Sequence, residues 1–189
     1  MPLQNLHEIL NRCTRGDTSA FRMLMEEYQS FAFAVAFRIV GNEEETRDLV
    51  QEAFIRIWRN INRYDPEVKF TTWMYSIVSN LCYDALRSDK RRQVVMMEHA
   101  DLSNLASLSP DENPEMLYTN HELASIIDTL TCTLPPKQKI IFVLRDLQDL
   151  SIREVCDILG VSEGSVKTNL VYARRTIRQQ LERFYAKRD

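Results

Sequence analysis

The sequence predicts an all-α protein, built as two small helical domains joined by a flexible acidic linker. Only 4 of the 189 residues are glycine, and the alternation of apolar and polar residues that marks a strand is rare. Apolar residues instead recur three and four positions apart, which places them on one face of a helix. A stretch without such a period separates two sets of helices, so we expect domains at 1–92 and 118–189 with a linker at 93–117.

The first domain is predicted to hold several helices, each ended by a turn signal. Gly16-Asp17 and Gly41-Asn42 are turn pairs, and Pro66 stops a helix because proline restricts the residue before it. The expected helices span residues 3–14, 18–40, 43–61 and 71–91.

The linker is predicted from its charge and its prolines. Residues 93–120 contain five acids and no Lys or Arg, together with Pro110 and Pro114. Beyond the linker, Pro136 suits the first turn of a helix, where its missing N–H donor is no loss. A helix is therefore expected over residues 137–147.

The segment from Ser151 to Arg175 predicts a helix, a short glycine turn and a second helix, which is the layout of a helix-turn-helix DNA reader. Ser151 can cap the first helix, Gly160 permits a left-handed exit from it, and Ser162 can cap the second. The apolar stripes are Ile152, Val155 and Leu159 on the first helix and Val166, Leu170, Ala173, Ile177 and Leu181 on the second. The residues left for a major groove are Ser165, Lys167, Thr168, Tyr172 and Arg175.

A helical hairpin with a basic outer face is also ordinary solvated structure, so the motif alone leaves both interpretations open. The net charge of the chain is −3, yet residues 151–189 carry eight Lys or Arg against five acids. Affinity for DNA comes largely from neutralised phosphates. The small total charge therefore predicts that a component other than this chain supplies part of the affinity for DNA.

No pattern in the chain predicts an enzyme, a metal site or a cofactor. Cysteines 13, 82, 132 and 156 lack the spacing of zinc ligands and are expected to be buried thiols, with Cys156 packed where two helices cross. The three histidines are scattered, and neither a phosphate loop nor a nucleophile elbow is present. No apolar run approaches the roughly 20 residues of a membrane span, and the start lacks the order of a secretion signal, so we expect a cytoplasmic protein without membrane insertion.

Two segments of the first domain carry further signals. The helix from Asp48 to Trp58 has an apolar stripe and, opposite it, an acidic and polar face that suits a basic protein partner or simply solvent. The segment from Phe70 to Arg92 mixes aromatic and basic residues, which fits single-stranded nucleic acid, although the aromatics also lie at the spacing of a helix core. We assign Trp73 to packing first, and expect contacts from the polar face of Asn80, Asp84 and Arg87.

Taken together, these segments resemble the extracytoplasmic-function (ECF) sigma factors, small members of the bacterial sigma-70 family. The similarity covers nearly the whole chain, and the order and spacing of its pieces are specific. Those pieces are Asp48-Leu-Val-Gln-Glu-Ala-Phe54, Phe70-Thr-Thr-Trp-Met-Tyr75, Leu134-Pro-Pro-Lys-Gln138, Leu144-Arg-Asp-Leu147 and Gly164-Ser-Val-Lys-Thr168.

The resemblance implies that the first domain binds the clamp of the largest RNA polymerase subunit and melts the minus-10 element. The implied polymerase contacts are Asp48, Gln51, Glu52, Phe54 and Trp58. The loop at residues 62–69 would capture a flipped-out base, whose extrusion costs a few kcal/mol. The implied minus-10 contacts are Arg63, Lys69, Thr71, Asn80, Asp84 and Arg87.

The resemblance also implies that the second domain meets the flap of the second polymerase subunit and reads the duplex minus-35 element. The implied contacts are Arg145, Ser165, Lys167, Thr168, Asn169, Tyr172, Arg174 and Arg175. Lys167 and Arg174 would chiefly hold phosphate, while Thr168 and Asn169 could reach base edges. Many family members have arginine where this chain has Asn169 and Tyr172, so the family's base preference does not carry over.

The partners implied by the resemblance are core RNA polymerase, promoter DNA and an anti-sigma factor that covers both domains. The central domain of larger family members is absent, and the acidic linker stands in its place. The residues leave a second function open, that of a free-standing helix-turn-helix repressor or activator whose first domain senses a ligand or dimerises. Tight binding of the chain alone to a promoter duplex at physiological salt would favour that alternative.

Overall fold

The computed structural model describes residues 5–99 and 130–186 of the chain. Both parts are helical and neither contains a strand, which confirms the predicted all-α class. The greater part of the predicted linker at 93–117, and the predicted start of the second domain at 118, lie outside the described residues. Among the described helices, none is long and apolar enough to cross a membrane.

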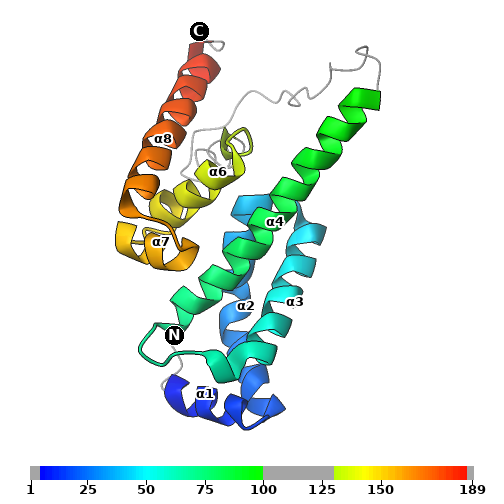
Figure 1. Ribbon diagram of the computed structural model, residues 1–189, viewed down its shortest axis with the longest axis vertical. Helices are drawn as coiled ribbons and strands as arrows, with labels where there is room; N and C mark the ends of the chain where they lie inside the picture. Colours follow the sequence, from blue (N-terminus) through cyan, green and yellow to red (C-terminus); the bar gives the residue numbers. More distant parts are fainter. Residues whose placement is uncertain (1–4, 100–129, 187–189) are drawn as a thin grey trace, which may run out of the picture.

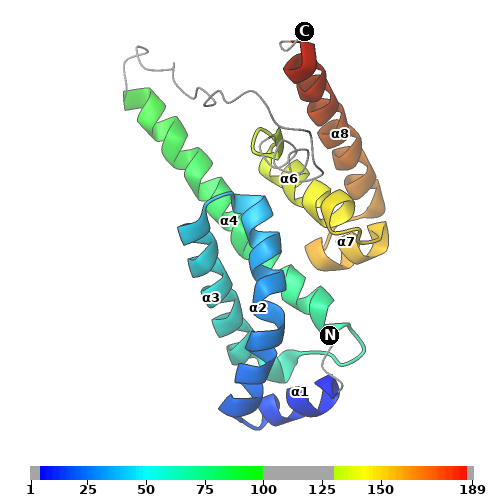
Figure 2. The same ribbon diagram turned by 180° about the vertical axis from the view of Figure 1, so that it is seen from behind.

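The first domain is built around three helices that pack side by side. Helices α2, α3 and α4 contact one another, and α1 lies across the end where α2 begins (Figures 1 and 2). The elements of this domain are α1 (Leu6–Thr14), α2 (Thr18–Val40), α3 (Glu43–Asn60), the 3-10 turn η1 (Ile61–Arg63) and α4 (Phe70–His99).

Side-chain caps and left-handed glycines set the helix boundaries as the sequence predicts. The Asp17 carboxylate accepts hydrogen bonds from the backbone N–H groups of Ser19 and Ala20, at 2.9 and 3.1 Å, and so caps α2. Gly41 ends α2 at a φ of 84°, and the Asn42 side chain then caps α3. The predicted turn pairs therefore lie where the chain turns.

Helix α4 is longer than predicted. The predicted helix ended at Arg91 and the linker began at residue 93, whereas α4 continues to His99. The reason is that no proline or glycine occurs between Lys90 and His99, so nothing in the local sequence stops the helix.

The second domain holds the helical hairpin. Its elements are α6 (Pro136–Phe142), η2 (Val143–Leu147), α7 (Ile152–Leu159) and α8 (Glu163–Ala186). The predicted helix over 137–147 forms, but its second half is the π-helical turn η2. Helix α8 packs on α6 and α7.

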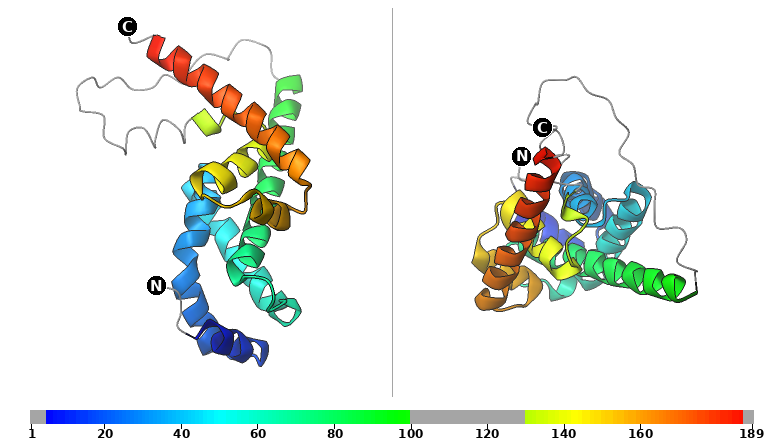
Figure 3. Two further views of the ribbon diagram at one scale, coloured as in Figure 1. Left: turned by 90° about the vertical axis from the view of Figure 1, so that its left-hand side faces the viewer. Right: turned by 90° about the horizontal axis from the view of Figure 1, so that it is seen from above.

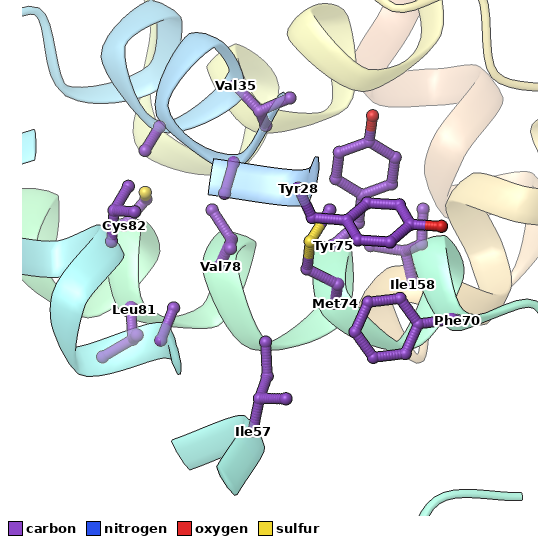
Figure 4. Close-up of a cluster of buried hydrophobic side chains, with 14 of the residues drawn as sticks. Tyr28, Val35, Ile57, Phe70, Met74, Tyr75, Val78, Leu81, Cys82 and Ile158 are labelled. Carbon is purple, nitrogen blue, oxygen red and sulfur yellow. The ribbon is translucent and has the colours of Figure 1, made fainter. Parts of the chain in front are cut away.

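The two domains lie against each other through α4. Helix α4 contacts both α6 and α7, and the views in Figures 1 and 3 show α7 beside its first half. One continuous cluster of buried apolar side chains contains residues of both domains, and Figure 4 shows Ile158 of α7 near Phe70 and Tyr75 of α4. A smaller cluster of Leu134, Phe142, Ala173 and Ile177 belongs to the second domain alone.

Candidate nucleic-acid interface

The helix-turn-helix begins with a reciprocal cap. The Ser151 hydroxyl accepts a hydrogen bond from the backbone N–H of Glu154 at 3.2 Å, and the Glu154 carboxylate accepts one from the backbone N–H of Ser151 at 3.0 Å. These bonds, with a further contribution from Lys69, lower the pKa of Glu154. Gly160 ends α7 at a φ of 62°, as the sequence predicts.

Helix α8 buries one face and exposes the other. The predicted stripe residues Val166, Leu170, Ala173 and Ile177 are buried, whereas Leu181 is half-buried. Of the predicted minus-35 residues, those that are exposed are Lys167, Thr168, Tyr172, Arg174 and Arg175. Those that are half-buried are Arg145, Ser165 and Asn169.

Several of these polar side chains already have partners within their own domain. Arg174 donates two hydrogen bonds to the Asp146 carboxylate, at 2.8 and 2.7 Å, which ties α8 to η2 and raises the pKa of the guanidinium. The Asn169 amide donates to the backbone carbonyl of Ser165 at 2.8 Å. Of the two predicted base-edge contacts, Thr168 is therefore the more accessible.

Two of the predicted cations form ion pairs one helical turn from a neighbouring acid. Lys167 lies 2.9 Å from Glu163, and Arg145 lies 3.3 Å from Asp149. The Lys167 pair is exposed, so it is weak and water can replace it. A phosphate can therefore compete for the Lys167 ammonium at small cost.

The sequence interpretation missed Val171 on the outer face of α8. Its side chain is 64% exposed, beside Tyr172 at 52%. Val171 follows Thr168 by three positions and precedes Arg175 by four, so the three residues share one face. In the sequence, Val171 directly follows the stripe residue Leu170, and one step along a helix turns a side chain away from the buried stripe. That position was the signal available in the sequence.

In the first domain, the predicted minus-10 residues lie on η1, the following loop and α4. Arg63, Lys69, Asn80, Asp84 and Arg87 are exposed, and Thr71 is half-buried. Residues 80, 84 and 87 are spaced at three and four, so α4 presents them on one face. The Arg87 guanidinium lies 5.5 Å from the centre of the Tyr83 ring, and this cation–π contact helps to fix the position of the guanidinium.

Aromatic packing holds the loop at residues 62–69. The Tyr64 ring lies 5.3 Å from Trp73 and 5.9 Å from Phe70, measured between ring centres, and the Tyr64 hydroxyl donates to the Val68 carbonyl at 2.5 Å. Phe70 is buried and Trp73 is half-buried against the core. The aromatic residues of this segment therefore serve the core, and polar side chains occupy its exposed face.

The predicted polymerase face on α3 is divided between surface and core. Asp48 and Gln51 are exposed, and Glu52 pairs with Arg56 at 2.8 Å. Phe54 is only 3% exposed and lies edge-on to Phe21, and it also lines a groove between α2 and α3. Trp58 is half-buried, with its ring centre 4.8 Å from that of Phe21.

Two hollows adjoin these residues. A groove of about 750 Å³ runs between α2 and α3, and Gln51, Arg47 and Phe33 are among its lining residues. A smaller cavity of about 200 Å³ lies between the domains, where Asn80 and Tyr83 of α4 face Leu159 and Val161.

Among residues 5–99 and 130–186, no group of His, Cys, Asp and Glu side chains is arranged to hold a metal ion.

Comparison with known proteins identifies both domains. The family described as Sigma-70 region 2 matches residues 24–92, and the one described as Sigma-70, region 4 matches residues 124–177. The ECF RNA polymerase sigma factor SigW of Bacillus subtilis is 32% identical over 176 residues, which cover 91% of this chain and 94% of SigW. The ECF RNA polymerase sigma-E factor of Escherichia coli K12 is 29% identical over 178 residues, which cover 92% and 93% of the two chains.

Solved structures share the fold at lower identity. CnrH in complex with the cytosolic domain of CnrY matches with a TM-score of 0.62 and 20% identity, over 92% of this chain and 95% of that one. The sigma factor RpoE of Bartonella quintana, in complex with the anti-sigma factor NepR, matches with a TM-score of 0.63 and 17% identity, over 86% and 96%. With its two sigma-70 regions and its similarity to SigW along nearly its whole length, the chain belongs to the ECF sigma factors of RNA polymerase.

Proposed function

We propose that this sigma factor divides promoter recognition between two surfaces, one on each domain. The minus-35 face is the outer side of α8, formed by Lys167, Thr168, Tyr172 and Arg175. The minus-10 face is formed by Arg63, Lys69, Asn80, Asp84 and Arg87. The observation that supports this division is the exposure of both sets of polar side chains on separate domains.

The minus-35 face suits duplex DNA. A helix of this kind enters the major groove with its first turns, and Thr168 lies in the second turn of α8. Lys167 and Arg175 would hold phosphates on either side, which positions the helix without reading the sequence. Arg174 is also predicted to hold a phosphate. Its guanidinium already binds the Asp146 carboxylate, so it would have to bind both groups at once.

The minus-10 face suits an opened strand. The loop at 62–69 is braced by Tyr64, so a base turned out of the duplex would meet a preformed surface, with Asn80 on the next helix. Lys69 and Arg87 would hold the strand's phosphates. Thr71, Asp84 and Arg63 would complete the contact.

The polymerase surface proposed here is the exposed side of α3 with the groove beside it. Asp48 and Gln51 offer negative and polar groups to a basic partner, which the clamp of the largest polymerase subunit would supply. Glu52 contributes through its exposed side, while Phe54 and Trp58 would support the helix from beneath. The flap of the second subunit would hold the second domain.

We further infer that the protein acts in the cytoplasm, as an initiation factor without an enzymatic step of its own, because its polymerase and its promoters are there. An anti-sigma factor is a proposed regulator, since the similar RpoE was solved with one. This partner would cover the surfaces named above.

The proposal is tested with purified chain and core RNA polymerase. We expect polymerase with this chain to start transcripts at discrete sites, and sequencing of the 5′ ends would give the promoter letters. The chain alone should bind the same promoter duplexes weakly at physiological salt, because polymerase supplies much of the grip. Tight binding by the chain alone, with no transcripts from the complex, would contradict the proposal.

Two substitutions test whether the two domains act on different promoter elements. Lys167→Ala should weaken closed complexes at all promoters alike and reduce the slope of affinity against salt by about 1, as expected for one lost phosphate contact. Asn80→Ala should leave closed complexes intact and reduce strand opening, measured by permanganate reactivity of thymines. Arg15→Ala changes the net charge by the same amount as Lys167→Ala, on exposed surface of the first domain, and should change neither. Equal effects of Lys167→Ala and Asn80→Ala on closed complexes would contradict the assignment of separate roles to the two domains.

A further inference from the structure

A thiol and a buried lysine meet in the turn that precedes α6. The Lys139 ammonium donates a hydrogen bond to the Cys132 sulfur at 3.7 Å. A Cβ atom added to Gly41 would lie 3.7 Å from the same sulfur, so Cys132 reaches the turn between α2 and α3. Cys82 of α4 lies close by, because its thiol pKa is raised by burial and by Glu45 and is lowered in part by the Lys139 ammonium (Figure 4).

The Lys139 ammonium is buried without a carboxylate partner. Lys139 is only 3% exposed, and within the described residues no carboxylate lies within 4.0 Å of its ammonium. A buried charge is costly unless an opposite charge or strong hydrogen-bond acceptors replace the lost water. A neutral thiol is a weak acceptor, whereas a thiolate supplies the missing negative charge. The surroundings of Lys139 therefore favour an anion at the Cys132 sulfur.

Cys132 differs from the other three cysteines in its access to solvent. It is exposed, although the sequence interpretation expected a buried thiol. Cys13 and Cys82 are buried, and burial is the main cause that raises the pKa of each. Cys156 is half-buried, and burial together with nearby acids raises the pKa of its thiol. A reactive cysteine needs both access and a stabilised thiolate, and Cys132 combines an exposed position with a neighbouring cation.

We propose that Cys132 is an oxidation site for peroxides and that the Lys139 ammonium activates it. The thiolate sulfur attacks one oxygen of hydrogen peroxide, so that an S–O bond forms and the O–O bond breaks. The sulfur is oxidised, the peroxide is reduced, and the departing hydroxide takes up the thiol proton to give water. The product is a sulfenic acid, whose anion the same ammonium would hold. Neither residue belongs to the promoter or polymerase surfaces, so this inference does not depend on the proposed function.

The test treats the full chain with hydrogen peroxide, traps sulfenic acid with dimedone and measures the adduct at each cysteine by peptide mass spectrometry. In the unaltered chain, we expect adduct to form at Cys132 roughly tenfold faster than at Cys156. Lys139→Met should slow the reaction at Cys132 roughly tenfold, because a side chain of similar length replaces the cation. Lys137→Met removes the same charge from an exposed position nearby and should leave the rate unchanged. Equal rates in the two variants would overturn the proposal.

A second measurement separates the charge at Cys132 from its accessibility. Iodoacetate and iodoacetamide alkylate the same thiol and are similar in size, but only iodoacetate is negatively charged. The ratio of their rates at Cys132 should therefore exceed the ratio at Cys156, and it should fall in Lys139→Met. A change in packing alone would alter both rates together. An unchanged ratio in a folded Lys139→Met chain would overturn the role of Lys139, even if oxidation by peroxide became slower.

The unaltered chain decides the outcome if Lys139→Met does not fold, as judged by circular dichroism. Faster oxidation at Cys132 than at Cys156, with a higher ratio of iodoacetate to iodoacetamide alkylation, would support the proposal. Oxidation at Cys132 that is no faster than at Cys156 would overturn the oxidation site. Faster oxidation without the higher ratio would overturn activation by the ammonium.

Discussion

At the residue scale, Cys82 shows how burial changes the chemistry of a side chain. It is fully buried on α4, and burial together with the nearby Glu45 raises the pKa of its thiol from 9.0 to about 12. The folded chain therefore keeps a proton that the unfolded chain loses above pH 9. The contribution of the Cys82 thiol to the free energy of unfolding is fully present below pH 9 and is lost as the pH rises towards 12.

We expect the free energy of unfolding to fall above pH 9, with Cys82 contributing about 1.4 kcal/mol per pH unit, the value for one proton. Urea titrations at pH 8, 9 and 10 would measure the slope. Cys82→Ala should give a shallower slope by that amount, whatever its stability at pH 8. Identical slopes would show that the thiol is not buried in its neutral form.

Val171 is suited to a contact with a thymine methyl group. It is exposed on the outer face of α8, and apolar side chains read that methyl in the major groove. Val171→Ala should cost about 0.8 kcal/mol for each buried carbon lost at such a site. The measurement compares promoter duplexes that carry thymine or uracil in the minus-35 element, with polymerase present.

The comparison has an internal control. Uracil lacks the methyl group, so its substitution should weaken complexes of the unaltered chain and leave those of Val171→Ala nearly unchanged. If uracil weakens both complexes equally at every position, Val171 does not read a methyl group.

At the element scale, the turn between α7 and α8 depends on the backbone of Gly160. Its φ of 62° lies in the left-handed region, and a Cβ atom added there would meet no atom within 4 Å. The cost of Gly160→Ala is therefore backbone strain alone, about 1 kcal/mol. Thermal unfolding should show a lower melting temperature.

Gly164 supplies the matched control for this prediction. A Cβ atom there also has open space, but Gly164 lies within the first turn of α8 and its φ is not left-handed. Gly164→Ala should raise stability by up to about 1 kcal/mol, because alanine favours a helix over glycine. Changes of the same sign in both variants would contradict the assigned turn geometry.

At the scale of the whole molecule, the two domains should unfold together. They share one continuous apolar cluster, and the cluster that belongs to the second domain alone is small. We expect a single calorimetric transition whose calorimetric and van't Hoff enthalpies agree. Ile158→Gln should separate this transition into two, and two transitions in the unaltered chain would show that the domains are independent.

The sequence predicted local features well. The bounds of α2 were predicted as 18–40 and are Thr18–Val40, because Asp17 and Gly41 act on their immediate neighbours. The cap at Ser151 and the left-handed Gly160 are likewise confirmed. The end of α4 was predicted too early, since charge and composition were taken as a helix stop where no stop residue exists.

The candidate site was predictable only in part. Lys167, Thr168 and Tyr172 are exposed because the apolar stripe of α8 fixes which side faces outwards. The burial of Phe54 was not predictable, because it depends on Phe21, which packs against it from another helix. The partner of Arg174 was also not predictable, because Asp146 lies 28 residues away in the chain.

The sequence by itself determined the helices, the helix-turn-helix, the outward face of α8 and the similarity to ECF sigma factors, because these depend on residues within a few turns of one another. The tertiary structure alone decided that α7 turns Glu154 and Ile158 towards α4. Lys69 and Glu154 are 85 residues apart, and no periodicity reports a contact over that distance. That contact holds the second domain against the loop that precedes α4.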